Sequence, residues 1–205
     1  MKIPQVRIKF SELLYDNVSV HLNELWAKGR DSIASKEQCE EWAENYRQEW
    51  AKYESKILPA ICQELSLEFH KPVIDVSLAP WIRAMSDPLI MSFNKYPNQF
   101  VDALTHELVH VLLTDNNKFT FFDDGAEPLD ERWKKLFGEE HSFTTLVHIP
   151  VHAVLKYVYL DVLDEPNRLE RDIDDNKKTP GYKEAWQYVE DNDYKQIINK
   201  LKNSY

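Results

Sequence analysis

The residues best suited by type and spacing to do chemistry form one short segment, His106-Glu107-Leu108-Val109-His110. On an α-helix, positions 106 and 110 are about 40° apart around the axis and one turn apart along it, so both imidazoles can reach one zinc ion. Glu107 points to another side of that helix, where it can hold a metal-bound water and act as a general base. The pattern predicts a catalytic zinc site with His106 and His110 as two of its ligands.

The sequence on both sides of this motif is largely apolar. Residues 99–105 lead into it, and Val111, Leu112 and Leu113 follow it. A helix of this composition is expected to be buried, and buried imidazole and carboxyl groups are costly unless a partner satisfies them. A bound metal would satisfy them. The alternative is that both histidines only make hydrogen bonds inside the core.

A catalytic zinc site normally has a third protein ligand, and the downstream sequence offers acidic candidates for it. The metzincin form of the motif needs glycine at position 113 and histidine at position 116, where this chain has Leu113 and Asn116. A thermolysin-like spacing of about 20 residues would select Glu131, although the residues around it do not follow the usual pattern. The other acidic candidates are Glu127, Glu139 and Glu140.

A second apolar helix, expected over about 140–163, offers histidines instead. Its histidines are His141, His148 and His152. Their offsets place them within about 40° of arc, on one stripe of an ideal helix. Pro150 removes a backbone hydrogen bond and can kink this helix, which would change which histidine reaches the metal. We favour His148, the central one, as the third ligand over His152, His141 and Glu131.

Composition predicts a globular chain with one main core. The chain has 205 residues, of which 43% are hydrophobic and 12% aromatic. These values predict a single domain over 1–205, with a helical N-terminal part at 1–70 and a catalytic core with C-terminal helices at 71–205. The net charge of −10 and the absence of a clustered basic segment argue against nucleic-acid binding.

Targeting and redox signals favour the cytoplasm. No window approaches the 18 apolar residues of a membrane-spanning helix, and residues 1–7 contain no apolar core of a signal peptide. Cys39 and Cys62 are 23 residues apart in one expected helix, or roughly 34 Å if it is continuous, so they are not expected to form a disulfide. Free buried thiols suit a reducing compartment.

Periodicity and turn residues predict the elements that must position these groups. Residues 35–38 form a capping box that opens one long helix to about residue 66, which Pro59 can kink or split. Residues 164–178 are predicted to be a charged surface connection, and Thr179 to cap a single final helix. Strands are expected at 3–10, 73–78 and 89–93, and further helices at 97–114 and 129–137.

The strand expected over 89–93, followed by the helix that carries His106, Glu107 and His110, resembles the core of the zincin metallopeptidase superfamily. In that family a strand beside the active-site cleft pairs with extended substrate, and the motif helix packs beneath it. The resemblance implies an α+β, zincin-like fold, mostly helical, with a small sheet beside a buried motif helix. It also implies that His106 and His110 bind zinc and that Glu107 activates the water.

The expected function is therefore that of a cytoplasmic zinc-dependent metallopeptidase, a hydrolase with one zinc ion and a peptide or protein substrate. Asp102, one turn before the motif, is the nearest carboxylate that could orient a ligand imidazole. Tyr157, Tyr159 and His152 are candidate donors to the oxyanion of the reaction. The alternatives are a non-catalytic, zinc-stabilised interaction protein on the same fold and an amidase that acts on small molecules.

Overall fold

The computed structural model describes residues 2–17, 34–80, 82–93, 96–116 and 129–205. The chain is mostly helical with one small mixed sheet, which confirms the predicted α+β class. Within the described ranges, none of the helices combines the length and apolar character needed to cross a membrane.

The chain divides into two compact units. The sheet unit comprises Pro4–Ser55 and Lys71–Glu107, and the helical unit comprises mainly Lys56–His70 and Leu108–Tyr205. The division falls within helix α4 (Pro97–Asp115), so this one helix contributes residues to both units.

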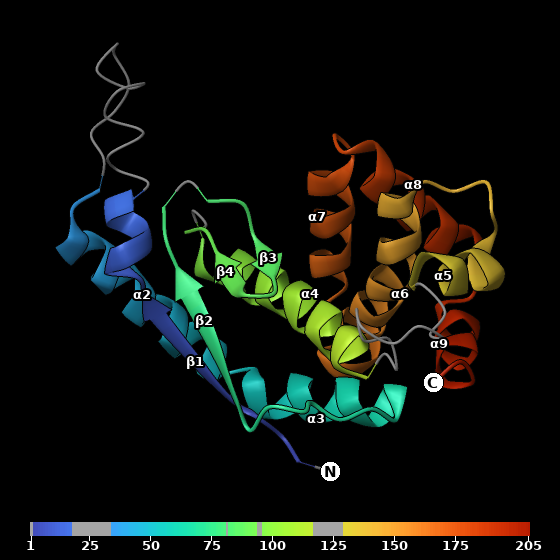
Figure 1. Cartoon of the computed structure of the whole chain (residues 1–205), viewed down its shortest axis with the longest axis horizontal. Coiled ribbons are helices and arrows are strands. Elements are labelled where there is room, and N and C mark those ends of the chain that lie inside the picture. Colours follow the sequence, from blue (N-terminus) through green and yellow to red (C-terminus); the bar gives the residue numbers. More distant parts are fainter. Residues whose placement is uncertain (1, 18–33, 81, 94–95, 117–128) are drawn as a thin grey trace, which may run out of the picture. The chain divides into compact units, whose positions relative to one another are not determined.

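The sheet unit contains a four-stranded sheet in the order β1-β2-β4-β3 (Figure 1). β1, β2 and β4 are parallel, whereas the short β3 pairs antiparallel with β4. The predicted strand at 73–78 is confirmed, while the strands predicted at 3–10 and 89–93 are each two residues shorter and β3 was not predicted. The strands are β1 (Gln5–Phe10), β2 (Val73–Leu78), β3 (Met85–Ser86) and β4 (Leu89–Met91).

Helix α2 (Lys36–Ala51) packs along β1 and begins at the predicted capping box. The Ser35 hydroxyl accepts a hydrogen bond from the backbone N–H of Gln38, and the Gln38 side chain accepts one from the backbone N–H of Ser35. On the buried side of α2, Tyr46 stacks on Phe100 of α4 with ring centroids 4.3 Å apart. This contact joins α2 to the first half of the motif helix.

The prediction of one long helix from residue 35 to about residue 66 is wrong, because two helices occupy that stretch. α2 ends at Ala51 and α3 (Glu54–Leu65) follows a turn at Lys52 and Tyr53. Pro59 lies inside α3. The N–H that it lacks would have bonded the carbonyl of Ser55, which is exposed in the first turn and can bond to water, so the proline is tolerated there. Cys39 and Cys62 are both buried and free, as predicted.

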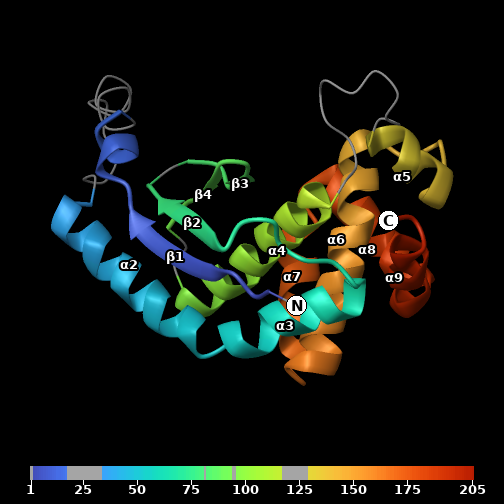
Figure 2. The same cartoon turned by 60° about the horizontal axis from the view of Figure 1, so that its bottom comes forward.

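The helical unit is organised around one central buried helix, α6 (Phe143–Tyr157), which the sequence predicted. Three helices pack against it: α5 (Leu129–Phe137), α8 (Pro180–Asp191) and α9 (Tyr194–Lys202) (Figure 2). The side chains of Leu146, Ile149 and Val154 in α6 are completely buried. α6 is therefore the main core element of this unit.

Two predictions for the C-terminal third are wrong in ways that local signals explain. Residues 164–178 are not a connection, since α7 (Pro166–Asn176) is a helix with proline in its first turn, a favoured position. The predicted final helix is interrupted between α8 and α9, where the Asp193 side chain accepts a hydrogen bond from the backbone N–H of Lys195 and starts a new helix.

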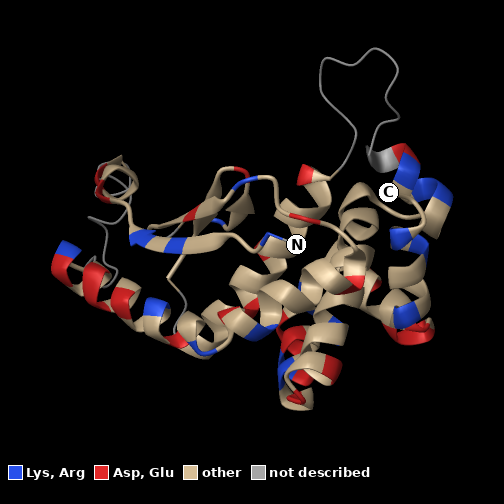
Figure 3. Ribbon diagram, turned by 90° about the horizontal axis from the view of Figure 1, so that it is seen from below, with Lys and Arg blue, Asp and Glu red and all other residues tan. Residues whose placement is uncertain are grey.

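The transition between α6 and α7 is also unusual. α6 continues directly into a π-helical turn, η1 (Val158–Val162), in which the Leu163 N–H donates to the carbonyl of Val158. The charges are unevenly distributed among the helices: acidic residues dominate α2, whereas α6 contains a single charged residue, Lys156 (Figure 3).

The capping box provides a test of the local fold. The substitution Ser35→Ala should lower the free energy of unfolding by about 1 kcal/mol, because the backbone N–H of Gln38 in the first turn of α2 loses its hydrogen-bond acceptor. Chemical denaturation measures the change. Ser55→Ala is the matched control, since this serine is exposed inside a helix and should change stability little. Equal losses in the two variants would contradict the capping role.

Candidate metal site

Helix α4 carries the motif and matches its prediction to within one residue. Its apolar positions Leu104, Leu108 and Leu112 are completely buried. They recur every four residues, which fixes the rotation of the helix about its axis. His106 is 9% exposed, so the first motif histidine is nearly buried as well.

The predicted ligand set comes together in the structure. One nitrogen from each of His106, His110 and His148 lies within 4.8 Å of the other two. Zinc–nitrogen bonds of about 2.0–2.1 Å require nitrogens about 3.4 Å apart in a tetrahedral site, so small side-chain adjustments suffice. The donor set of three imidazoles suits zinc and other first-row transition metals. The rings of His110 and His148 are in edge-to-face contact, with centroids 5.1 Å apart.

His148 is held in the tautomer that a metal ligand needs. Its Nδ1 lies 2.6 Å from the backbone carbonyl of Thr144, one turn earlier in α6. A carbonyl only accepts, so Nδ1 carries the proton and Nε2 carries the lone pair. Histidines that bind metals commonly donate their other ring nitrogen to a carbonyl in this way, which fixes the direction of the ring.

Burial sets the protonation of the motif residues. Desolvation lowers the pKa of His110 to about 3, helped by the neighbouring His148, so its imidazole is neutral at pH 7 as metal binding requires. Desolvation raises the pKa of Glu107 to about 7, and the positive charge of Arg83 opposes this rise. The pKa of Glu107 is therefore close to neutral pH, where a carboxyl group can both take up and release a proton.

The other two candidate histidines have different environments: His152 lies in α6, whereas His141 lies two residues before its start, so the prediction that it belongs to this helix is wrong. His152 is completely buried and its ring stacks on Trp186, with centroids 4.2 Å apart. His141 bonds through Nδ1 to the carboxylate of Glu184 at 2.7 Å. Neither belongs to the three-histidine group, so of these three candidates the geometry selects His148, the one that the sequence favoured.

The acidic alternatives do not join the group among the residues described. Glu131 forms an exposed ion pair with Lys134, and Glu139 and Glu140 are exposed. Glu127 lies outside the described residues.

The residues predicted to assist the site are placed as follows. The Tyr159 hydroxyl donates to Asp172 of α7, and Tyr157 is half-buried. Asp102 is buried at 9% exposure, one turn before His106, and its role in orienting that ligand stays a prediction.

Sequence reasoning missed Tyr182. Its ring lies against His148 with centroids 3.9 Å apart and an angle of 35° between the ring planes. The two residues are 34 positions apart in sequence and lie on different helices. No local pattern relates them. A helical wheel of α8 that placed Tyr182 on the same side as Trp186 would have been the only available signal.

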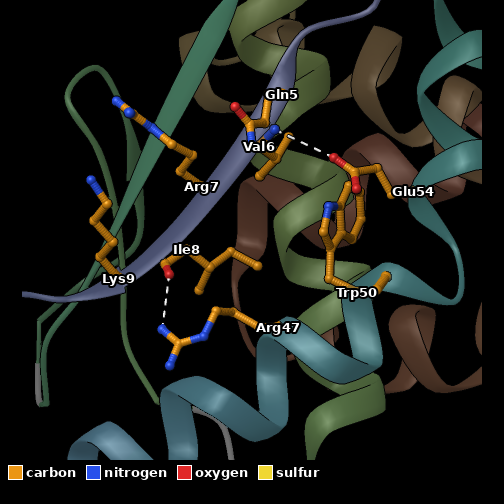
Figure 4. A pocket seen from close by; sticks show the side chains of 9 residues that line it. Gln5, Val6, Arg7, Ile8, Lys9, Arg47, Trp50 and Glu54 are labelled. Atoms are coloured by element: carbon orange, nitrogen blue, oxygen red, sulfur yellow. Dashed lines mark hydrogen bonds between the residues drawn. The ribbon is translucent and has the colours of Figure 1, made fainter.

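A separate hollow of about 300 Å³ lies in the sheet unit, between β1 and α2 (Figure 4). The Glu54 carboxylate accepts from the Val6 backbone N–H, and Arg47 donates to the Ile8 carbonyl. These side chains occupy hydrogen-bonding positions on the outer edge of β1 that a further strand would otherwise use. The hollow is thus explained by protection of an edge strand, and its lining contains no histidine or cysteine.

Comparison with known proteins finds no relative from which to transfer a role: no family model, no curated protein and no solved structure matches the chain. The function must therefore be argued from the geometry of the site.

The ligand set can be tested by measuring metal content. We expect about one zinc per chain in the purified protein, by analogy with other three-ligand sites. His148→Ala should lose it, because this imidazole supplies one of the three grouped nitrogens. His141→Ala is the control and should retain the metal, because this histidine lies outside the group and two residues before the start of α6. Elemental analysis measures all three proteins, and retention of zinc by His148→Ala would contradict the assignment.

Proposed function

We propose that the protein is a zinc-dependent metallopeptidase with a zincin-like arrangement of its motif helix. The observation that carries this proposal is the group of His106, His110 and His148, with Glu107 adjacent in sequence to the first of them. Three histidine nitrogens satisfy the protein part of a catalytic zinc site and leave one position for water or substrate.

In this proposal the histidines and Glu107 have different roles in hydrolysis. The three imidazoles would hold the ion in their neutral forms, which burial favours for His110. When bound there, zinc would act as a Lewis acid that lowers the pKa of a coordinated water and polarises the scissile carbonyl. Glu107 would take a proton from the attacking water and later give it to the leaving amine. A cation at the histidines would favour its carboxylate form.

The sheet has an outer strand that could pair with an extended peptide substrate, but it is β3 and not the strand expected at 89–93. Ile90 of β4 pairs with Ser77 on one side and Met85 on the other, so β4 lies inside the sheet. β3 is the outer strand next to β4, and in the proposed function it would pair with the substrate backbone.

The general-base role has a direct test. Glu107→Gln should reduce the hydrolysis of a fluorogenic peptide library by about 10²–10⁴-fold, because the amide cannot accept the proton of water. Its zinc content should stay that of the wild type, since Glu107 is not among the grouped ligands. Glu131→Gln, an exposed glutamate, serves as the control and should keep full activity.

Two outcomes of the same experiment would redirect the interpretation. Full activity of Glu107→Gln would show that the mechanism is wrong. A wild-type protein that binds zinc, hydrolyses nothing and loses much of its thermal stability on chelation would instead be a non-catalytic, zinc-stabilised protein.

A further inference from the structure

Two aromatic residues of α8 face two histidines of α6. Tyr182 lies against His148, and one turn later Trp186 stacks on His152 with an angle of 13° between the ring planes. His152 is also 5.7 Å from His148 and 5.8 Å from Tyr182, measured between ring centroids. Residues one turn apart on each helix thus form two adjacent ring pairs, and the first pair contains the third ligand of the proposed metal site.

α8 can come this close to α6 because position 181 is glycine. A Cβ atom built on Gly181 would lie 2.7 Å from Cγ2 and 2.8 Å from Cβ of Thr144. Thr144 is also the residue whose carbonyl holds Nδ1 of His148. The contact that admits α8 therefore adjoins the hydrogen bond that orients this imidazole.

A polar contact fixes the same part of α8 to the start of α6. The Glu184 carboxylate accepts hydrogen bonds from the Thr145 hydroxyl at 2.8 Å and bonds His141 with its other oxygen. Thr145 is completely buried. The first two turns of α8 are thus held against α6 on both sides of Tyr182, which limits the movement of that ring.

We propose that Tyr182 is a positioning residue for metal binding: its ring holds the His148 imidazole in the orientation in which Nε2 faces His106 and His110. The inference rests on the metal site of the proposed function. One face of the imidazole is covered by Tyr182, and Nδ1 is held by Thr144. Together these two contacts restrict both rotations of the side chain, so little conformational entropy is lost when a metal binds.

The contact that matters in this proposal is made by the ring and not by the hydroxyl. The ring centroids are 3.9 Å apart and the planes are tilted by 35°, so the two rings pack closely with one face of each turned partly toward the other. Phenylalanine can make the same contact, whereas leucine has similar hydrophobicity but no flat face. The pair Tyr182→Phe and Tyr182→Leu therefore separates stacking from simple filling of space.

The test measures zinc affinity by competition with a chromophoric chelator, and the visible spectrum after cobalt substitution. Tyr182→Leu should weaken zinc binding by about 10–100-fold, the range seen when groups that orient metal ligands are removed, and should change the cobalt spectrum. Tyr182→Phe should restore wild-type affinity and spectrum. The matched control is Tyr188→Leu, which removes a half-buried tyrosine of the same helix that contacts Phe137 and His141.

Each outcome decides one question. Tyr188→Leu should lower the melting temperature of the metal-free protein without changing zinc affinity. If Tyr182→Leu also loses only stability, Tyr182 is merely structural and the inference fails while the metal site stands. If Tyr182→Phe loses as much affinity as Tyr182→Leu, stacking is not the cause. A wild-type protein that takes up no zinc overturns the proposed function itself.

Discussion

The arrangement depends on the cost of burying imidazoles in an apolar helix bundle. α6 is the central helix of its unit, yet it places His148 and His152 at 8% and 0% exposure among aliphatic side chains. Desolvation lowers the pKa of His152 well below its usual range, and buried imidazole nitrogens need hydrogen-bond or metal partners. For His148 the helix supplies one partner from its own backbone at Thr144. One ring nitrogen of His148 also lies within 4.8 Å of a nitrogen of each motif histidine.

The supporting contacts follow from that cost. A helix that presents flat rings to buried imidazoles makes better contact than one that presents aliphatic side chains, and α8 provides Tyr182 and Trp186 at the required spacing. The glycine at position 181 allows the two backbones to approach, and Glu184 hydrogen-bonds the Thr145 hydroxyl in the first turn of α6. Ring packing, hydrogen bonding and the glycine at position 181 all act at the interface between α6 and α8. Together they restrict the imidazole of His148.

Features encoded by neighbouring residues could be predicted from the sequence. The motif helix, the capping box at Ser35 and the strand at 73–78 all have period or cap signals within a few residues. His148 was also favoured from the sequence by its spacing from its neighbouring histidines, and it lies in the three-histidine group, although His141 proved to lie outside α6.

Features decided by tertiary contacts could not be predicted in this way. The break at Lys52 and Tyr53 has no proline or glycine, and Pro59 remains inside a helix because its lost hydrogen bond falls at an exposed turn. β3 is too short to show alternation. Tyr182 meets His148 only after two helices pack together, and one sequence carries no sign of that pairing.

The π-helical turn after α6 has a consequence for how the chain tolerates insertions and deletions. A π-turn is closed by i→i+5 hydrogen bonds and so holds one more residue than an α-turn. The turn at Val158–Val162 takes up that extra residue after the last ligand-bearing position, so the phase of His148 relative to the motif helix is preserved. Loss of one residue there would convert the π-turn into an α-turn, and the non-helical residues 163–165 separate that change from α7.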